Sequence, residues 1–431
     1  MIARTLLKAW LIISVVYIIV SCDSRKEKST TSEASKDSVN TVSDELNQDQ
    51  LPIDTSAIEF ADVKIEHPRG DTFSLRIPKD FKIKIVATGL MRPRFMDFDP
   101  DGNLFVTDMY NLADNSRGAI YKYEIRETYN LVNRVTYLSG LRNPNSAVFH
   151  IDKEKKLWLY VAMTDKLIRI PYAVNDSLPS GPPQQLDTYP DYGLSYRYGG
   201  WHLTRTIAFN DSSELYISVG SSCNSCIEKE EVRASLIRMN EDGNNRKIIA
   251  SGLRNAVGLA WANGKLYVSN MAADHLGKDK PDDAVFEIEE GKHYGWPYFF
   301  HWNGAVYRDS KYDTVRLTMD STQIPSAFSY LGAHTAPLGL AWFGEKESSD
   351  PVLKNYFLLA QHGSYTPSIG RGYSLQRIRR NHKPEDFITG FLDKQGKVHG
   401  RPCGIKSAGA DSFYFTDDKF GTIYYVYKDD Q

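Results

Sequence analysis

One histidine stands where catalysis would need a proton acceptor. His202 opens the segment HLTRTIAF, directly before a strand-like run, and Arg205 follows three residues later. A histidine side chain has an unperturbed pKa of about 6.5, which makes it the commonest general base near neutral pH. A lone histidine is more often a structural residue with its hydrogen bonds satisfied. The residues alone therefore leave two interpretations open, a general base or a structural residue.

Two further motifs carry charged groups. Arg254 and Asn255 lie in GLRNAVGLAW, where an arginine could bind a carboxylate through two parallel hydrogen bonds or pair with an acid between repeats. Asp274, Asp282 and Asp283 lie in a loop that contains Gly and Pro. Clustered acids and backbone carbonyls suit a hard cation such as Ca²⁺, although the spacing is not that of an EF-hand. An acidic turn without metal is the alternative.

The pair Cys223–Cys226 has the CxxC spacing. Covalent haem attachment would require His after the second cysteine, and Ile227 stands there instead. A thioredoxin-like role lacks its βαβ context. A small disulfide loop or two buried thiols remain, and the disulfide is favoured. We expect Cys403 to be an inert buried thiol.

A degenerate repeat of strands must position these residues. Each unit has an apolar strand, a turn and a second strand that ends in small polar residues, followed by a third strand such as AIYKYE. The units start at Gly89, Gly140, His202, Gly252, Ala336 and Gly400. Their spacing and the lack of helical periodicity predict an all-β fold, a six-bladed β-propeller of four-stranded antiparallel blades around a central channel. A sandwich or barrel is the alternative. Propeller loops at the channel mouth are the expected ligand site.

The first residues predict export and a lipid anchor. Arg4 and Lys8 precede an apolar run that ends at Ser21, and Ile19–Cys22 resembles a bacterial lipobox. We therefore predict a lipoprotein signal peptide over 1–21, with lipid on Cys22 and an anchor on the periplasmic side of the cell envelope. An ordinary signal peptide or an uncleaved anchor helix is the alternative. Residues 22–57 are too polar to bury a core and predict a disordered tether, which leaves 58–431 for the propeller.

The overall charge excludes one class of partner. Formal net charge is −2, which gives no electrostatic basis for binding nucleic acid.

An ordered series of short motifs identifies a family. GSSCNSC, RAS-IR, DG, GLRNAVGLAW, DHLG, DD and YGWP are followed by QHGS, GY, DFITGFL, GRPCG and TDD-FGTIYYVY, between about residues 81 and 428. Each motif is weak by itself, but in this order they resemble the pyrroloquinoline quinone (PQQ)-dependent sugar dehydrogenases, especially the sorbosone dehydrogenase-like branch. The resemblance implies a six-bladed propeller that holds PQQ through Ca²⁺, with a histidine base.

The resemblance also implies roles for individual residues. His202 matches the base that takes a proton from the sugar hydroxyl while hydride passes to PQQ. The cofactor-binding residues that it implies are Arg254, Asn255, Asn145, Arg205, Arg371 and Arg401, with Asn143 as the less favoured amide position. The carbonyls of Ala272 and Ala273, beside Asp274, match the calcium ligands. The implied partners are a small-molecule sugar, the membrane through the lipid anchor, and a respiratory electron acceptor.

Some residues depart from the family pattern. Asn270 replaces an acid before the calcium carbonyls, Ala272-Ala273 replaces a Gly-Pro-like pair, and Ala284 replaces an acid after Asp283. Calcium affinity follows the charge of the ligand set, so these changes favour a second hypothesis, a non-redox binding or scaffold propeller that has lost its cofactor. A calcium-dependent lactonase of the gluconolactonase type is the third, and the motifs support it least.

Overall fold

The computed structural model describes residues 58–126, 129–190 and 202–428. They belong to one compact unit, residues 48–431. The predicted signal peptide, Cys22 and the predicted tether lie outside the described residues. Within them, no helix is long and apolar enough to cross a membrane.

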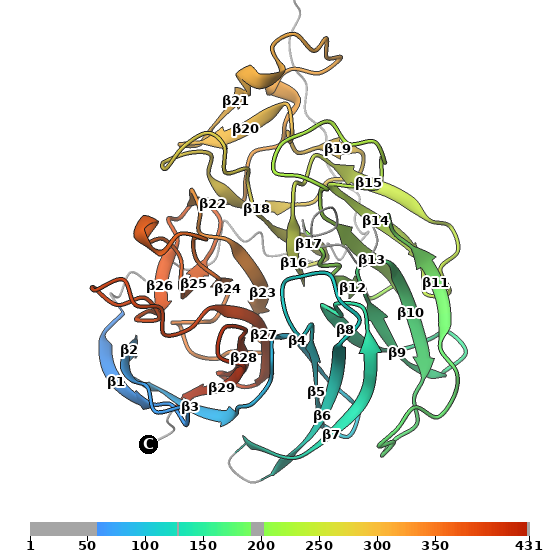
Figure 1. Cartoon of the computed structure of the whole chain (residues 1–431), viewed down its shortest axis with the longest axis vertical. Coiled ribbons are helices and arrows are strands. Elements are labelled where there is room, and N and C mark those ends of the chain that lie inside the picture. Colours follow the sequence, from blue (N-terminus) through green and yellow to red (C-terminus); the bar gives the residue numbers. More distant parts are fainter. Residues whose placement is uncertain (1–57, 127–128, 191–201, 429–431) are drawn as a thin grey trace, which may run out of the picture. The chain divides into compact units, whose positions relative to one another are not determined.

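Within the described residues, six sheets of four or five strands are the six blades of a propeller, and the four blade strands of each are antiparallel (Figure 1). The prediction of an all-β six-bladed propeller is confirmed. Blade 1 consists of β4 (Pro93–Phe98), β5 (Leu104–Asp108), β6 (Gly118–Arg126) and β7 (Asn130–Leu141). Blade 2 consists of β8 (Ser146–Ile151), β9 (Leu157–Ala162), β10 (Lys166–Pro171) and β11 (Gln184–Thr188). Blade 3 consists of β12 (Ile207–Phe209), β13 (Glu214–Val219), β14 (Ser235–Asn240) and β15 (Lys247–Ser251), and β19 (Lys292–His293) pairs with β15.

Blades 4 to 6 complete the ring. Blade 4 consists of β16 (Ala256–Ala262), β17 (Lys265–Asn270), β18 (Asp283–Glu287) and β22 (Ser329–Gly332). Blade 5 consists of β23 (Pro337–Phe343), β24 (Tyr356–Gln361), β25 (Ser374–Ile378) and β26 (Glu385–Ile388). Blade 6 consists of β27 (Pro402–Gly409), β28 (Ser412–Asp417), β29 (Thr422–Lys428) and β3 (Phe81–Ala87). The last blade therefore takes its outer strand from the start of the domain. This pairing of β3 with β29 ties the two ends of the ring together and covers an edge that would otherwise be open.

Smaller elements lie outside the blades. Two hairpins are β1 (Phe60–Glu66) with β2 (Thr72–Pro78), and β20 (Phe299–Trp302) with β21 (Ala305–Arg308). Short 3-10 turns are η3 (Ser310–Tyr312), η4 (Ser321–Gln323) and η5 (Pro367–Ile369).

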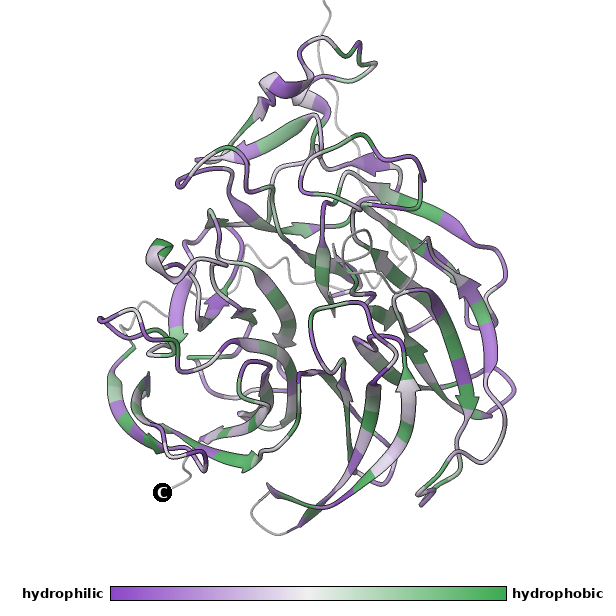
Figure 2. Cartoon of the chain, viewed as in Figure 1, coloured by the Kyte–Doolittle hydropathy of each residue, from purple (hydrophilic) through white to green (hydrophobic). Residues whose placement is uncertain are grey.

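Burial explains why the second strand of a blade is so apolar. Every residue of β5, β24 and β28 is buried, because neighbouring blades cover both faces of these strands. In contrast, the residues of an outer strand such as β11 are exposed or only partly buried. Figure 2 shows the same trend, with purple along β11 and green on the strands nearer the centre. Rigid, doubly covered strands thus end at the loops that carry the polar motifs.

Candidate functional site

The antiparallel register brings the predicted site residues to one end of the ring. In each blade, the residue after the second strand lies beside the residues before the first strand. Backbone hydrogen bonds mark this register in Met109 N to Arg92 O (3.1 Å), Met271 N to Asn255 O (3.1 Å) and Asp418 N to Arg401 O (3.3 Å). We call this end the mouth; it contains the loops that begin at residues 88, 142, 202, 252, 333 and 399 and those that follow β5, β9, β13, β17, β24 and β28.

The surroundings of His202 determine which ring nitrogen carries the proton. Its Nδ1 lies 2.8 Å from Ser221 Oγ and 3.0 Å from Ser221 O. Ser221 Oγ donates its own proton to Cys223 O at 2.7 Å, so it accepts from the imidazole, and the carbonyl can only accept. Nδ1 is therefore the donor, and the basic lone pair of the neutral ring is on Nε2.

Electrostatics keep this histidine neutral. Burial lowers the pKa of His202 well below its usual value, and the nearby positive charge of Arg254 lowers it further, as do Arg205 and Arg233. A neutral imidazole at pH 7 has the protonation state that a general base requires.

The backbone around His202 is held tightly. His202 has a φ of 44°, in the left-handed region, and Arg205 Nη1 donates to its carbonyl at 2.8 Å. Gly220 lies against it: a Cβ there would approach the His202 Cβ to 2.5 Å and Asn255 Oδ1 to 2.7 Å. The position of Gly220 thus allows His202 and Asn255, from different blades, to lie close together.

Arg254 is bound through the disulfide loop, residues Cys223–Cys226, whose cysteines are joined in the structure. Arg254 Nε donates to Asn224 O and Arg254 Nη2 to Asn224 Oδ1, each at 2.8 Å. Nη1 donates to Ala272 O at 2.8 Å, and Asp274 lies 3.5 Å from Nη2. The arginine is 3% exposed, so its charge is held inside the mouth.

Asp283 anchors the segment that carries the predicted calcium carbonyls. Its carboxylate accepts from Ala272 N at 2.7 Å, Ala336 N at 2.9 Å and Thr335 Oγ1 at 3.0 Å. Burial raises the pKa of Asp283 to about 6, against the effect of these hydrogen bonds. Asn270 stands where the family resemblance implies an acid. Its Oδ1 accepts a hydrogen bond from Asn255 N at 3.0 Å, so this side chain has a partner within the protein.

A second group of charges lies across the mouth, and sequence analysis assigned no role to most of it. This Asp418 cluster consists of Arg92, Arg94, His362, Arg401 and Asp418. Arg92 and Arg94 reach Asp418 Oδ2 at 3.0 and 2.7 Å, and His362 Nε2 donates to Oδ1 at 2.7 Å. The QHGS motif begins at the last residue of β24 and the TDD motif begins within the last residues of β28, and these strand ends were the signal that could have led to His362 and Asp418.

Both ring nitrogens of His362 are used within this cluster. Arg401 Nη1 donates to His362 Nδ1 at 3.2 Å, and a guanidinium can only donate. Burial lowers the pKa of His362 despite the neighbouring Asp418. His362 is therefore neutral with its proton on Nε2, the opposite tautomer to that of His202.

The remaining predicted residues fall into two groups. Asn145 joins the mouth: its Oδ1 accepts from Arg94 Nε at 2.9 Å and its Nδ2 donates to Thr206 Oγ1 at 2.9 Å. The less favoured Asn143 instead holds the loop after β5, where its Oδ1 accepts from Asn115 N. Arg371 donates to Lys278 O at 2.7 Å and pairs with Asp279, which is 73% exposed.

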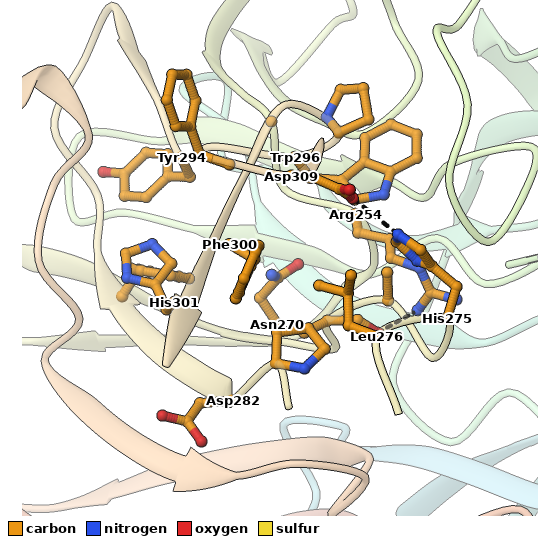
Figure 3. Close-up of a pocket in the computed structure, with 17 residues that line it drawn as sticks. Arg254, Asn270, His275, Leu276, Asp282, Tyr294, Trp296, Phe300, His301 and Asp309 are labelled. Atoms are coloured by element: carbon orange, nitrogen blue, oxygen red, sulfur yellow. Dashed lines mark hydrogen bonds and ion pairs between the residues drawn. The ribbon is translucent and has the colours of Figure 1, made fainter. Parts of the chain in front are cut away.

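A pocket lies behind Arg254 and the Ala272–Ala273 segment. Figure 3 shows Trp296, Arg254 and His275 along one side and Tyr294 and His301 along the other. Phe286, Phe299 and Phe300 add to its apolar wall, and His275 Nε2 lies 2.7 Å from Asp309 Oδ2. Arg254 thus lines a pocket whose wall is largely aromatic.

A family model described as TrAA12-like matches residues 75–429. The chain belongs to this family. A relative from Borreliella burgdorferi, an uncharacterized protein, is 28% identical over 372 residues, which are 83% of this chain and 91% of that protein. The predicted membership of the PQQ-dependent sugar dehydrogenase family is confirmed, whereas the sorbosone branch stays a prediction.

Solved structures share the fold of this TrAA12-like chain. The holo form of the pyranose dehydrogenase PQQ domain from Coprinopsis cinerea has a TM-score of 0.66 at 16% identity, covering 82% of this chain and 97% of that one. The PQQ-bound aldose sugar dehydrogenase from Streptomyces coelicolor has a TM-score of 0.55 at 17% identity, covering 81% and 99%. At these identities the likeness concerns the fold.

The charges at the mouth fit an anionic cofactor better than they fit a calcium ion. Three arginines place positive charge near His202, which suits an anion. The buried Asn255 Oδ1 has no hydrogen-bond partner among the described residues, and because an amide oxygen can only accept, it would bind a donor group of a ligand. The calcium ligand set is less complete, because Ala272 O already accepts from Arg254 and Asn270 replaces a carboxylate. Asp274, 58% exposed at its side chain, supplies the nearest acid to Arg254.

Proposed function

We propose that this protein is a membrane-tethered quinoprotein dehydrogenase that oxidises a sugar, an aldose or a sorbosone-like substrate, by hydride transfer to PQQ. One observation carries the proposal: a neutral histidine with its proton on Nδ1 lies among arginines at the mouth of a propeller of this family. The family membership and the PQQ-bound neighbours support the cofactor.

The residues at the mouth would have two roles, cofactor binding and proton transfer. Arg254 and Asn255 would hold the anionic cofactor, with Arg205 and Asn145 supporting the walls of the site. PQQ, when bound, supplies the acceptor for the hydride that leaves the sugar carbon. Nε2 of His202 would take the proton of the sugar hydroxyl, and Ser221 would keep the ring oriented.

The lipid anchor predicted at Cys22 belongs to the same proposal. A tethered enzyme on the periplasmic side of the envelope would lie near a respiratory electron acceptor, which would reoxidise the quinone. The same exported location would permit the Cys223–Cys226 disulfide.

Reconstitution tests the function directly. The purified protein is incubated with PQQ and Ca²⁺, and dye reduction is followed with a panel of aldoses and sorbosone. We expect sugar-dependent reduction that requires PQQ. No cofactor absorbance change and no reduction with any sugar would contradict the proposal.

A pair of variants tests which histidine is the base. His202→Ala is expected to lower kcat by at least about 100-fold, the usual range for loss of a general base, while PQQ still binds. His362→Ala is the matched comparison, since its Nδ1 lone pair is occupied by Arg401. If only His362→Ala removes turnover in protein that remains folded, the base is His362.

A non-redox binding propeller remains the second candidate. Arg254 and Ala272 O satisfy each other, and Asn270 has an internal partner, so two groups at the predicted calcium segment already have partners within the protein. Sugar binding in the absence of any PQQ uptake would favour this candidate.

A further inference from the structure

Asn224 is the common acceptor for three separate parts of the mouth. Its carbonyl accepts from Arg254 Nε at 2.8 Å and Trp296 Nε1 at 3.2 Å. Its side-chain Oδ1 accepts from Arg254 Nη2 at 2.8 Å and from Asp274 N at 2.9 Å. One residue therefore holds the predicted cofactor arginine, the end of the predicted calcium segment and an aromatic wall of the pocket.

The position of Asn224 depends on the disulfide that encloses it. Cys223 and Cys226 are separated by three positions in sequence and are joined, which closes a small ring around Asn224 and Ser225. The same ring contains Cys223 O, which accepts a hydrogen bond from the Ser221 hydroxyl. The Ser221 oxygen is therefore left to act as the acceptor for His202 Nδ1. Without the disulfide, this four-residue turn would depend on backbone preference and on contacts such as that of Ser225 Oγ with Tyr312 Oη to hold these acceptors in place.

The acceptors that Asn224 offers are neutral, and this has a consequence for charge. Arg254 already has one acid nearby, the exposed Asp274, whose Oδ2 lies 3.5 Å from Nη2. An aspartate at position 224 would add a second carboxylate and neutralise more of the charge. A neutral acceptor orients the guanidinium by hydrogen bonds while more of its positive charge stays available to an anion.

We propose that Asn224 is a positioning residue that holds Arg254 and the Ala272–Asp274 segment in place for the anionic cofactor, and that the Cys223–Cys226 disulfide fixes Asn224. The inference rests on the proposed function for the identity of that ligand. The coupling between the disulfide loop and Arg254 stands on the contacts themselves.

The test compares Asn224→Ala with a matched variant of the same loop, Ser225→Ala, whose hydroxyl pairs with Tyr312 at 2.9 Å. Asn224→Ala is expected to raise the PQQ concentration for half-reconstitution at least about tenfold, equivalent to about 1.4 kcal/mol, while kcat at saturating PQQ changes little. Ser225→Ala is expected to behave like the wild type. Equal losses in both variants would indicate a general disturbance of the loop and overturn the proposal.

Two more variants test the charge at position 224 and the disulfide separately from the hydrogen bonds that Asn224 accepts. Asn224→Asp retains both oxygens, so Arg254 stays in place, yet its added charge is expected to weaken PQQ binding. Cys223→Ser with Cys226→Ser is expected to reproduce the Asn224→Ala loss. Wild-type PQQ binding in the double variant would show that the disulfide has no part in the positioning.

A readout independent of the cofactor keeps this test distinct from that of the proposed function. The indole N–H resonance of Trp296, assigned with Trp296→Phe, reports the hydrogen bond to Asn224 O in the ¹⁵N-labelled protein. We expect it to shift in the cysteine variant and to stay in Asn224→Ala, Asn224→Asp and Ser225→Ala, which all retain the Asn224 carbonyl. The backbone amide resonance of Asp274, which donates to Asn224 Oδ1, is expected to shift in Asn224→Ala. If the wild type binds no PQQ, the proposed function fails, and an unchanged Asp274 amide resonance in Asn224→Ala would overturn the positioning as well.

Discussion

The two sides of the mouth hold buried charge in opposite ways. In the Asp418 cluster, one carboxylate meets Arg92, Arg94 and His362 directly. Around the disulfide loop, Arg254 donates to neutral acceptors and lies 3.5 Å from the exposed Asp274, and the buried Asp283 accepts from neutral donors. The charges of the first side are balanced by close contacts within the protein, whereas those of the second side are balanced only in part, and a ligand could complete them.

The two histidines repeat this contrast. His362 uses both ring nitrogens for protein contacts, one to Asp418 and one from Arg401. The Ser221 contacts of His202 involve Nδ1, which leaves the basic lone pair on Nε2. The comparison teaches that two buried histidines of one site differ in which nitrogen carries the proton, and the proposed role of His202 as a base rests on that difference.

The largest expected effect comes from breaking the balanced side. Asp418→Asn leaves the buried Arg94 and the partly buried Arg92 without their carboxylate, and the free energy of unfolding should fall by about 3–5 kcal/mol. Urea unfolding measures this change. The matched control is Asp274→Asn, whose exposed carboxylate should contribute less than about 1 kcal/mol. A small effect of Asp418→Asn would remove the distinction between the two sides.

A pH series sharpens the contrast between the two buried carboxylates. Burial raises the pKa of Asp283 from 3.8 to about 6, so the folded protein binds this proton more tightly than the unfolded chain. The stability that this group contributes is present below pH 4 and is lost as pH rises through 6. Relative to Asp283→Asn, the wild type should therefore gain stability as pH falls from 7 to 4, by at most about 1.4 kcal/mol per pH unit.

Asp418 provides the opposite control for that series. The neighbouring His362, Arg92 and Arg94 hold the pKa of Asp418 far below its usual range despite burial. Its contribution is present above pH 4, so the difference between the wild type and Asp418→Asn should stay constant from pH 7 to 4. Parallel pH profiles for the two aspartate variants would contradict the assignment of opposite shifts.

The smallest effect is expected at Arg371. Its guanidinium binds Lys278 O and the exposed Asp279, so Arg371→Ala should change stability by less than about 1 kcal/mol. The PQQ concentration for half-reconstitution should change less than about threefold, in contrast to a loss of about tenfold or more in Arg254→Ala. A larger effect of Arg371→Ala would support the direct cofactor contact that the family resemblance implies.

Much of the fold was predictable because the repeat is local. Each unit carries its own turn and its own apolar strands, and strands that are buried on both faces give continuous apolar runs such as YFLLAQ in β24. The pairing of β3 with β29 was not predictable in this way, because it joins segments more than 300 residues apart and no local pattern specifies the partner.

The site was predictable in its residue types rather than in its contacts. His202, Arg254 and Asn255 precede first strands, and the register of the blades brings such positions to one end of the ring. Arg92 and Arg94 belong to the same end but have no distinctive spacing, so their cluster with Asp418 was missed.

By itself, the sequence determined the propeller fold, the family, and the residue types that could serve as a general base and as positive charges for binding an anion. These follow from strand periodicity and from motifs that are short and local. Only the tertiary structure decided the tautomer of His202, the occupation of His362 by Arg401, and the contacts of Arg254 with Asn224. Each of those depends on which atoms from different blades lie within hydrogen-bond distance, and chain order carries no information about that distance.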